Sequence, residues 1–435
     1  MTYQDTVNYL FNSYPVFEHV GGSAYKEGLG NTIALDNHFD HPHRSYKTIH
    51  IAGTNGKGSC SHTLAAILQK AGYKVGLYTS PHLVDFRERI RVNGVCISQE
   101  RVVRFVEDNK DFFEPLHPSF FELTTAMAFL YFKEQNVDIA VVEVGLGGRL
   151  DSTNIISPIL SIITNISFDH TQFLGNTLAK IAGEKAGIIK DDTPVVIGEA
   201  LPETQPVFER VATNHHAEIV FAESVPEVIS SEPNEAGGRN YKTRSYATFH
   251  AELGGEYQMK NTNTVLAAVN ILRRRHNHRA PLLNISEENV RSGFANVSGL
   301  TGLMGRWQTL RKVPRVVCDT GHNIGGWQYL ARQIQAQPCQ TMRIVFGMVD
   351  DKDVEGVMSM LPPNAVYYWT QATSKRAIPA QSIKELGQKH ALNGATYNTV
   401  AKAYRQALND ADQDDFIFIG GSSYVVADLL GLNDF

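Results

Sequence analysis

The stretch Gly53-Thr54-Asn55-Gly56-Lys57-Gly58-Ser59 combines three glycines with one lysine and two hydroxyl residues, which are residue types that bind phosphate. Backbone N–H groups in such a loop, together with the start of a following helix, can surround an anion. We expect Lys57 to reach the β- and γ-phosphates of a nucleotide and Ser59 to contact Mg²⁺. The loop differs from the common GxxxxGK[ST] motif because Gly58 separates the lysine from the serine. The alternative interpretation is a glycine-rich turn at the end of a sheet.

Metal-binding side chains follow two further apolar runs. Residues 137–144 predict a buried strand with Glu143 near its end, and residues 159–166 predict another strand, shortly before His170. A carboxylate at the tip of a hydrophobic strand is costly unless a cation meets it, and nucleotide-bound Mg²⁺ is such a cation. We therefore expect Glu143 and His170 to bind metal. The alternatives are a salt bridge from Glu143 to Arg149 and a structural role for the histidine.

These side chains must be brought together by a parallel sheet whose strands end at one edge. The apolar run 49–52 predicts a buried strand before the phosphate loop, and apolar residues at helical spacing after the loop predict a helix. Residues 73–78 predict a further strand that ends near the hydroxyl of Ser80, at the edge where open α/β sheets bind ligands. A helix is predicted over residues 175–189. Its spacing alone would leave Lys185 on a solvated face.

The length of 435 residues favours two domains. We expect the fold class α/β, with a P-loop-type, mostly parallel sheet in a nucleotide-binding domain over residues 1–298. A second, smaller α/β domain is expected over residues 299–435, because glycine density is high around residues 297–305 and strand–helix alternation then begins again. Residues 201–250 are polar and predicted to be irregular, and residues 230–240 predict an exposed excursion.

The composition indicates a soluble globular protein, with 43% hydrophobic and 20% charged residues. A net charge of −5 argues against nucleic acid as the main partner. The four cysteines show no CxxC pairing, and neither a signal peptide nor an 18-residue apolar run is present. We expect a cytoplasmic protein without a membrane span.

Seven motifs occur in an order that resembles the folylpolyglutamate synthase/dihydrofolate synthase family, a branch of the ATP-dependent muramyl-ligase superfamily. Along the chain they are GTNGKGS at 53–59, TSPH at 79–82, Glu143 with GLGGRLDSTN at 145–154, Asp169-His170, EKAG at 184–187, Gly305-Arg306-Trp307, and Asp319 with Gly321-His322-Asn323. The resemblance extends from about Tyr25 to the C-terminus. It implies an active site between a nucleotide-binding domain and a smaller C-terminal domain.

The resemblance also implies roles for single residues. Lys185 matches a lysine that is carbamylated in this family and then binds metal, so two Mg²⁺ sites are expected near it. The residues implied to bind ATP are Asn55, Gly56, Lys57, Gly58, Ser59, Asn261, Arg306 and Asp319. The residues implied to bind Mg²⁺ are Ser80, Glu143, His170 and Lys185. The residues implied to contact the pterin substrate are Phe120, Phe121, Glu122, Leu150, Asp151 and Ser152.

The expected reaction joins L-glutamate to dihydropteroate or a reduced folate through an acyl phosphate made from ATP. It needs no protein nucleophile, so the protein supplies positioning and charge neutralisation. His322 could orient a phosphate or accept a proton. Lys375 and Arg376 could hold glutamate carboxylates, although a solvated surface pair is the alternative. A monomer is expected.

Two other functions compete with this one. A muramyl-peptide ligase shares the loop, the carboxylate and the lysine, but normally has an additional N-terminal domain, and only about 50 residues precede this loop. A nucleotide-dependent switch would usually contain a motif such as NKxD, which is not found in this sequence. The sequence does not decide between dihydropteroate and tetrahydrofolate as acceptors, nor how many glutamates are added.

Overall fold

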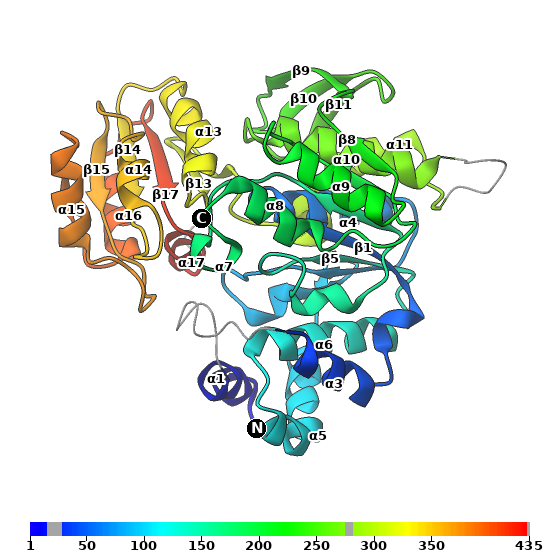
Figure 1. Ribbon diagram of the computed structural model, residues 1–435. Helices are drawn as coiled ribbons and strands as arrows, with labels where there is room; N and C mark the ends of the chain where they lie inside the picture. The colour runs from blue at the N-terminus through cyan, green and yellow to red at the C-terminus, as the bar shows by residue number, and fades with distance from the viewer. Residues whose placement is uncertain (15–27, 275–281, 433–435) are drawn as a thin grey trace. The chain divides into compact units, whose positions relative to one another are not determined.

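The structure is a computed structural model that describes residues 1–14, 28–274 and 282–432 (Figure 1). The chain forms two compact units. Unit 1 contains Met1–Glu232, Asn240–Glu252 and Met259–Leu303, and unit 2 contains Pro233–Arg239, Leu253–Gln258 and Met304–Phe435. The predicted boundary between residues 298 and 299 falls inside a short helix, α12 (Val297–Thr301). The assignment of two functional domains stays a prediction.

An eight-stranded sheet forms the centre of unit 1, in the order β4-β3-β2-β5-β1-β6-β7-β8. The strands from β2 to β8 in this order are parallel, and β3 and β4 are antiparallel additions at one edge. This confirms the predicted mostly parallel sheet. The bounds are β1 (Lys47–Ala52), β2 (Val75–Tyr78), β3 (Ile90–Val92), β4 (Val95–Cys96), β5 (Ile139–Glu143), β6 (Leu160–Ile163), β7 (Val195–Ile197) and β8 (Ile219–Phe221).

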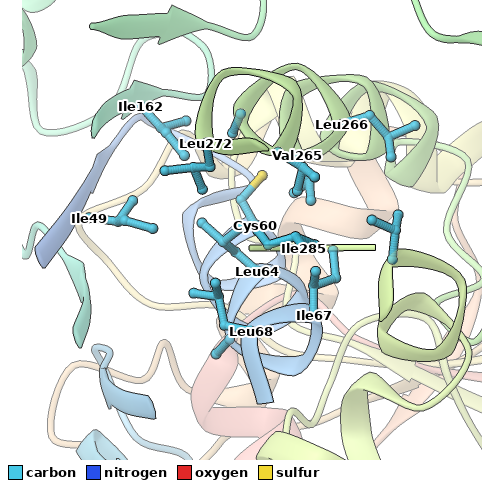
Figure 2. Packing of buried hydrophobic residues seen from close by; sticks show 14 of the residues in the cluster. Ile49, Cys60, Leu64, Ile67, Leu68, Ile162, Val265, Leu266, Leu272 and Ile285 are labelled. Carbon is cyan, nitrogen blue, oxygen red and sulfur yellow. The ribbon is translucent and has the colours of Figure 1, made fainter. Parts of the chain in front are cut away.

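Alternating side chains of the central strands enter different cores, as the two-residue period of a strand requires. Ile49 and Ile51 of β1 pack in a cluster with helix α4 (Lys57–Lys70) and helix α10 (Gln258–Arg273). Figure 2 shows this packing, with Cys60, Leu64 and Leu68 of α4 near Val265 and Leu272 of α10. Ala140 and Val142 of β5 belong to a second cluster, whose helical residues come largely from α5 and α6. The central strands are therefore buried on both faces.

Several of the remaining helices of unit 1 begin after a residue whose side chain caps the helix, although others do not. Helix α6 starts after Ser119, which forms a capping box with Glu122. The helices of this set, α6 included, are α1 (Tyr3–Ser13), α3 (Gly30–His38), α5 (Gln99–Leu116), α6 (Phe120–Glu134), α7 (Thr171–Leu174), α8 (Leu178–Ala186), α9 (Gln205–Asn214) and α11 (Glu287–Phe294). The 3₁₀ turns are η2 (Pro42–Ser45), η3 (Phe86–Arg89) and η4 (Ser152–Ile155). None of the helices in the described part of the chain is long and apolar enough to span a bilayer.

The expectation that residues 201–250 are irregular was wrong. This region contains α9, β8 and a three-stranded sheet in the order β11-β10-β9, formed by β9 (Val228–Pro233), β10 (Arg239–Thr243) and β11 (Thr248–Ala251). The polar composition misled because only one face of these strands is buried. In β10 the alternate residues Arg239, Tyr241 and Thr243 are buried while the residues between them are exposed.

Unit 2 is built on a six-stranded sheet in the order β12-β13-β17-β14-β15-β16, in which only β12 is antiparallel. This confirms the predicted second α/β unit. Its strands are β12 (Gln308–Lys312), β13 (Arg315–Asp319), β14 (Met342–Phe346), β15 (Val366–Trp369), β16 (Gly394–Thr396) and β17 (Phe416–Gly420). Its helices are α13 (Ile324–Gln335), α14 (Val354–Met358), α15 (Ala380–Lys389), α16 (Val400–Asn409) and α17 (Ser423–Leu430).

Candidate active site

The phosphate-binding loop lies between β1 and α4, as predicted. Gly56 is the N-cap of α4, with a φ of 85°, and it makes no side-chain cap hydrogen bond. The first N–H groups of the helix are therefore not capped by the side chain at this position, which is the arrangement that favours an anion at a helix N-terminus.

Side chains that follow β6 hold this loop in shape. The Thr164 hydroxyl donates to the Asn55 carbonyl at 2.6 Å, and the Asn55 N–H donates to Asn165 Oδ1 at 2.9 Å. A Cβ at residue 53 would lie 1.8 Å from Thr164 Oγ1, so only glycine fits there. A Cβ at residue 56 would lie 2.3 Å from Asn261 Oδ1, which places this predicted ATP-binding residue against the loop.

The loop lysine folds back over its own loop in this structure. Lys57 Nζ donates to the carbonyls of Gly53 at 3.0 Å and Thr54 at 3.2 Å. A bound phosphate would offer the ammonium a charged acceptor instead of these neutral ones, and charge-assisted hydrogen bonds are stronger. Ser59 is buried within the first turn of α4.

The predicted metal-binding residues follow adjacent strands of one sheet. In the order β2-β5-β1-β6, Tyr78 is in register with Val142, and Glu143 is in register with Ile51. Ser80, Glu143 and His170 therefore follow the carboxyl ends of parallel neighbours, at the same edge as the phosphate loop. Glu143 is only 3% exposed, and a carboxylate buried to that degree suits a cation.

The geometry around the predicted metal-binding residues has two further features. His170 has a left-handed backbone, with a φ of 50°, and its N–H donates to Asp169 Oδ1 at 2.9 Å. Arg149, the alternative partner considered for Glu143, forms an ion pair with Glu184 at 2.9 Å. Within the described ranges, no group of three or more His, Cys, Asp or Glu side chains has metal-binding geometry. The predicted set is a mixed one that also needs a serine and a modified lysine.

Lys185 is the largest departure from expectation at this site. Helical spacing predicted a solvated face, but the side chain is 4% exposed. Spacing alone misled because the GLGGRLDSTN segment covers this end of α8: Arg149 N–H donates to the Glu184 carbonyl, and a Cβ at Gly148 would lie 3.0 Å from the Lys185 carbonyl. Burial, followed by the charge of Lys57, lowers the pKa of the Lys185 amine to about 7, against the raising influence of Asp169 and Asp151.

The predicted pterin contacts cluster around the same segment. A Cβ at Gly145 would lie 2.5 Å from the ring of Phe121, so the segment after β5 packs directly on that aromatic side chain. Asp151 is buried, and its carboxylate accepts the Leu146 N–H and the Thr153 N–H, both at 2.9 Å. Glu122 is also buried, where its carboxylate accepts the Ser119 N–H in the capping box.

The predicted residues of unit 2 lie together at the end of β13. Asp319 is buried, and its carboxylate accepts hydrogen bonds from the Tyr257 hydroxyl at 2.6 Å, the Trp307 N–H at 2.7 Å and the Gly321 N–H at 2.8 Å. Burial raises the pKa of Asp319, and these donors oppose that rise. Arg306 contacts the Thr320 hydroxyl, and His322 Nδ1 lies 3.1 Å from the Thr320 carbonyl. Arg376 is ion-paired with Asp351, while Lys375 is exposed.

Sequence reasoning missed several residues that shape this site. Thr164 and Asn165 hold the phosphate loop, and the only available signal was that polar residues follow an apolar run. Asn154 Nδ2 donates to the carbonyls of Arg149 and Gly187 at 3.0 Å each, which ties the GLGGRLDSTN segment to the end of α8. No spacing rule connects residues so far apart in the sequence.

Comparison with known proteins identifies the family. The family model described as "Mur ligase middle domain" matches residues 51–269, and "Mur ligase, glutamate ligase domain" matches residues 305–423. The dihydrofolate synthase/folylpolyglutamate synthase of Bacillus subtilis is 37% identical over 347 residues, which cover 77% of this chain and 79% of that protein. The chain belongs to the folylpolyglutamate synthase/dihydrofolate synthase family. This confirms the predicted family and its place in the Mur ligase superfamily.

Solved structures of the family agree with this fold. E. coli FolC in complex with DHPP and ADP superimposes with a TM-score of 0.84 at 30% identity, covering all of this chain and 98% of that one. A bifunctional folylpolyglutamate synthase/dihydrofolate synthase with Mn, AMPPNP and L-glutamate bound gives a TM-score of 0.80 at 28% identity, covering 100% of this chain and 98% of the other. These comparisons support the folate-type ligase and not the two alternatives, a muramyl-peptide ligase and a nucleotide-dependent switch.

Proposed function

We propose that this chain is an ATP-dependent ligase that adds L-glutamate to the carboxylate of dihydropteroate or a reduced folate. The observation that carries the proposal is the glycine-rich loop with Lys57, at the same sheet edge as Glu143 and His170. Family membership supports the choice of substrates, because the relatives are named as folylpolyglutamate and dihydrofolate synthases. Structures of two relatives contain ADP with DHPP, or AMPPNP with Mn and L-glutamate.

The chemistry follows from the substrates. A carboxylate oxygen of the pterin acid attacks the γ-phosphorus of ATP, so that an acyl phosphate forms and ADP leaves. The glutamate amine then attacks the acyl carbon, the C–O bond to phosphate breaks, and the nitrogen loses a proton. Because three anionic reactants meet, the protein must position them and neutralise their charge.

In this proposal the residues from Asn55 to Ser59 bind the ATP phosphates, and Lys57 leaves its loop carbonyls for the γ-phosphate. Asn261, Arg306 and Asp319 are proposed to bind the nucleotide. Asp319 already accepts three hydrogen bonds, so we expect it to act partly by holding Tyr257 and Trp307. His322 is proposed to orient a phosphate or to accept the amine proton.

The donor set at the sheet edge fits Mg²⁺ if Lys185 is modified. Ser80 offers a hydroxyl and Glu143 a buried carboxylate, and oxygen ligands are those that Mg²⁺ prefers. His170 is the proposed nitrogen ligand. Mg²⁺, when bound, would neutralise charge on the phosphate oxygens. Two Mg²⁺ sites are proposed.

Carbamylation of Lys185 is proposed because an ammonium group beside a divalent cation would repel it. A pKa of about 7 leaves a substantial neutral fraction of the amine at physiological pH. The neutral nitrogen can attack the carbon of CO₂ and release a proton, which gives a carbamate with two oxygens. Burial then shields the product from water.

We propose that residues 1–298 form an ATP-binding domain and that residues 299–435 form a ligase domain. The residues proposed to contact the pterin acid are Phe120 to Glu122 and Leu150 to Ser152. The protein is proposed to act as a monomer in the cytoplasm.

A phosphate-release assay tests the function. The purified protein would be given ATP and Mg²⁺ with dihydropteroate or tetrahydrofolate, each with and without L-glutamate. We expect steady phosphate release only when glutamate and at least one pterin acid are both present. Release that is independent of both would contradict the proposal, and the two acids together distinguish a monofunctional from a bifunctional enzyme.

A further inference from the structure

His50 is a buried histidine at the centre of β1 that has no part in the chemistry described above. Its side chain is fully buried. Nε2 lies 2.8 Å from the Thr153 hydroxyl oxygen, whereas Nδ1 has no hydrogen-bond partner among the described residues. A buried polar atom without a partner costs about 1–3 kcal/mol, so its presence in a central strand requires a reason.

The hydroxyl group beside His50 already donates a hydrogen bond to a carboxylate. Thr153 Oγ1 donates to Asp151 Oδ1 at 2.5 Å, and the Thr153 N–H donates to the same oxygen at 2.9 Å. The other oxygen, Oδ2, accepts the Leu146 N–H at 2.9 Å. Burial raises the pKa of Asp151, while the hydrogen bonds from Thr153 and Leu146 oppose that rise. Because both oxygens accept, the ionised carboxylate is the form that these contacts favour.

The direction of the remaining hydrogen bond follows from counting protons. A threonine hydroxyl has one hydrogen, and here that hydrogen points to Asp151. His50 must then donate through Nε2–H, which leaves Nδ1 as an unprotonated acceptor. This assignment agrees with the general rule that an orphaned buried acceptor is less rare than an orphaned N–H donor. Burial, with Lys190 nearby, lowers the pKa of His50 to about 3, so the ring stays neutral.

We propose that His50 and Thr153 are positioning residues for the pterin acid, acting through Asp151 on the segment from Gly145 to Ser152. The inference rests on the proposed function, because Leu150 to Ser152, at the end of that segment, are proposed to contact the substrate. His50 orients the Thr153 hydroxyl, Thr153 holds the carboxylate, and the carboxylate ties Leu146 to the far end of the segment. Neither residue touches the reacting atoms.

The fold itself does not depend on this relay. The backbone of β1, including that of His50, pairs with β5 and β6, and the side chains of Ile49 and Ile51 lie in the cluster with α4. The relay instead fixes the segment that packs on Phe121, where Gly145 leaves no space for a Cβ. A change in the relay should therefore alter binding of one substrate before it alters stability.

Kinetics of matched variants test this proposal. His50→Phe removes the donor, while His50→Gln retains an N–H donor; Thr153→Val removes the hydroxyl, while Thr153→Ser retains it. Thr48→Val is the control, because Thr48 is buried two residues before His50 in the same strand. We expect His50→Phe and Thr153→Val to raise KM for the pterin acid at least tenfold. In the same variants KM for ATP and glutamate should stay within twofold, and the Gln and Ser variants should recover most of the loss.

Equal changes in all three KM values, or no rescue by Gln and Ser, would overturn the proposal and leave a purely structural role. A second measurement does not depend on activity. In ¹⁵N-labelled parent protein, assigned by comparison with His50→Gln, we expect a neutral Nε2–H ring at both pH 6 and pH 8. A cationic ring or an Nδ1–H tautomer would also overturn it. If the parent protein releases no phosphate with pterin acid and glutamate, the proposed function fails, while the tautomer result still decides the hydrogen-bond assignment.

Discussion

Lys185 links stability to activity at the scale of a single residue. Its pKa of about 7 in the folded protein is far below the ordinary value of 10.5, since burial disfavours the charged amine. Between these two pH values the unfolded chain holds a proton that the folded protein lacks. In CO₂-free buffer the parent protein should therefore gain stability as pH rises from 7 to 10, by up to about 1.4 kcal/mol per pH unit.

Lys185→Met removes this titration. We expect the variant to lose most ligase activity but to be more stable than the parent at pH 7 without CO₂, with a difference that shrinks toward pH 10. Urea unfolding at pH 7 and pH 10, with and without bicarbonate, measures both effects. Bicarbonate should stabilise only the parent, because binding to the folded state alone raises stability. A parent protein that does not respond to bicarbonate in either assay would count against the carbamate.

Lys57 should matter for phosphate charge and little for folding. Its ammonium donates only to two carbonyls of its own loop. We expect Lys57→Met to lower kcat/KM for ATP by about 10²–10³-fold, as the loss of one charge-stabilising group usually does. Lys70→Met, at the exposed last residue of the same helix, should leave kcat/KM within twofold. Circular dichroism would check that both variants fold.

The sequence predicted which residue types gather at the sheet edge, but not how they are bonded. The loop, Glu143 and His170 follow strands, and strand ends can be recognised from local patterns. The burial of Lys185 and the relay from His50 to Asp151 depend on a segment about 30 residues away in one case and 100 in the other. Side-chain contacts at that separation have no local signature.

At the scale of an element, the two ends of α4 offer a controlled comparison. Gly56 precedes the helix with a φ of 85°, and Gly72 follows it with a φ of 89°. Alanine at either position should cost about 1 kcal/mol through the left-handed backbone. Only at Gly56 would the new Cβ meet another residue, Asn261 Oδ1 at 2.3 Å, since nothing lies within 4 Å at Gly72.

We expect Gly56→Ala to raise the dissociation constant for an ATP analogue at least tenfold, and Gly72→Ala to leave it unchanged. Gly56→Ala should also lose more stability than Gly72→Ala, because only its Cβ must displace a neighbouring side chain, and thermal unfolding would measure this difference. Equal affinities in the two variants would mean that the α4 N-terminus does not bind the nucleotide.

Strands that are buried on both faces were predicted well, whereas strands with only one buried face were not. Strands β5 and β6 lie in apolar runs, so their existence was predicted and only their ends shifted by a few residues. The three-stranded sheet of β9, β10 and β11 was missed, because its exposed face makes the sequence as polar as a loop. The short helix α12 was missed because two of the residues near it are glycines that resemble a linker.

At the scale of the whole molecule, the chain passes between the two units more than once. Leu253–Gln258 belongs to unit 2, although the chain on both sides of it belongs to unit 1. Within unit 2, the Glu256 N–H donates to Gln333 Oε1 at 2.7 Å, and the Tyr257 hydroxyl donates to Asp319 at 2.6 Å. If unit 1 unfolds, we therefore expect the segment Leu253–Gln258 to lose its hydrogen bonds within unit 2, which would destabilise that unit.

The positions of the tryptophans make this coupling measurable. All three, Trp307, Trp327 and Trp369, are buried in unit 2, so tryptophan fluorescence follows that unit, while circular dichroism follows both. We expect the two signals to give the same unfolding midpoint in urea. An ATP analogue with Mg²⁺, proposed to bind residues of both units, should raise the fluorescence midpoint as well as the dichroism midpoint. Tyr257→Phe, which loses the hydroxyl that Asp319 accepts, should separate the two midpoints, whereas Tyr329→Phe, in the same unit, should not. Separate midpoints in the parent protein would show that the units unfold independently and that the shared segment does not couple them.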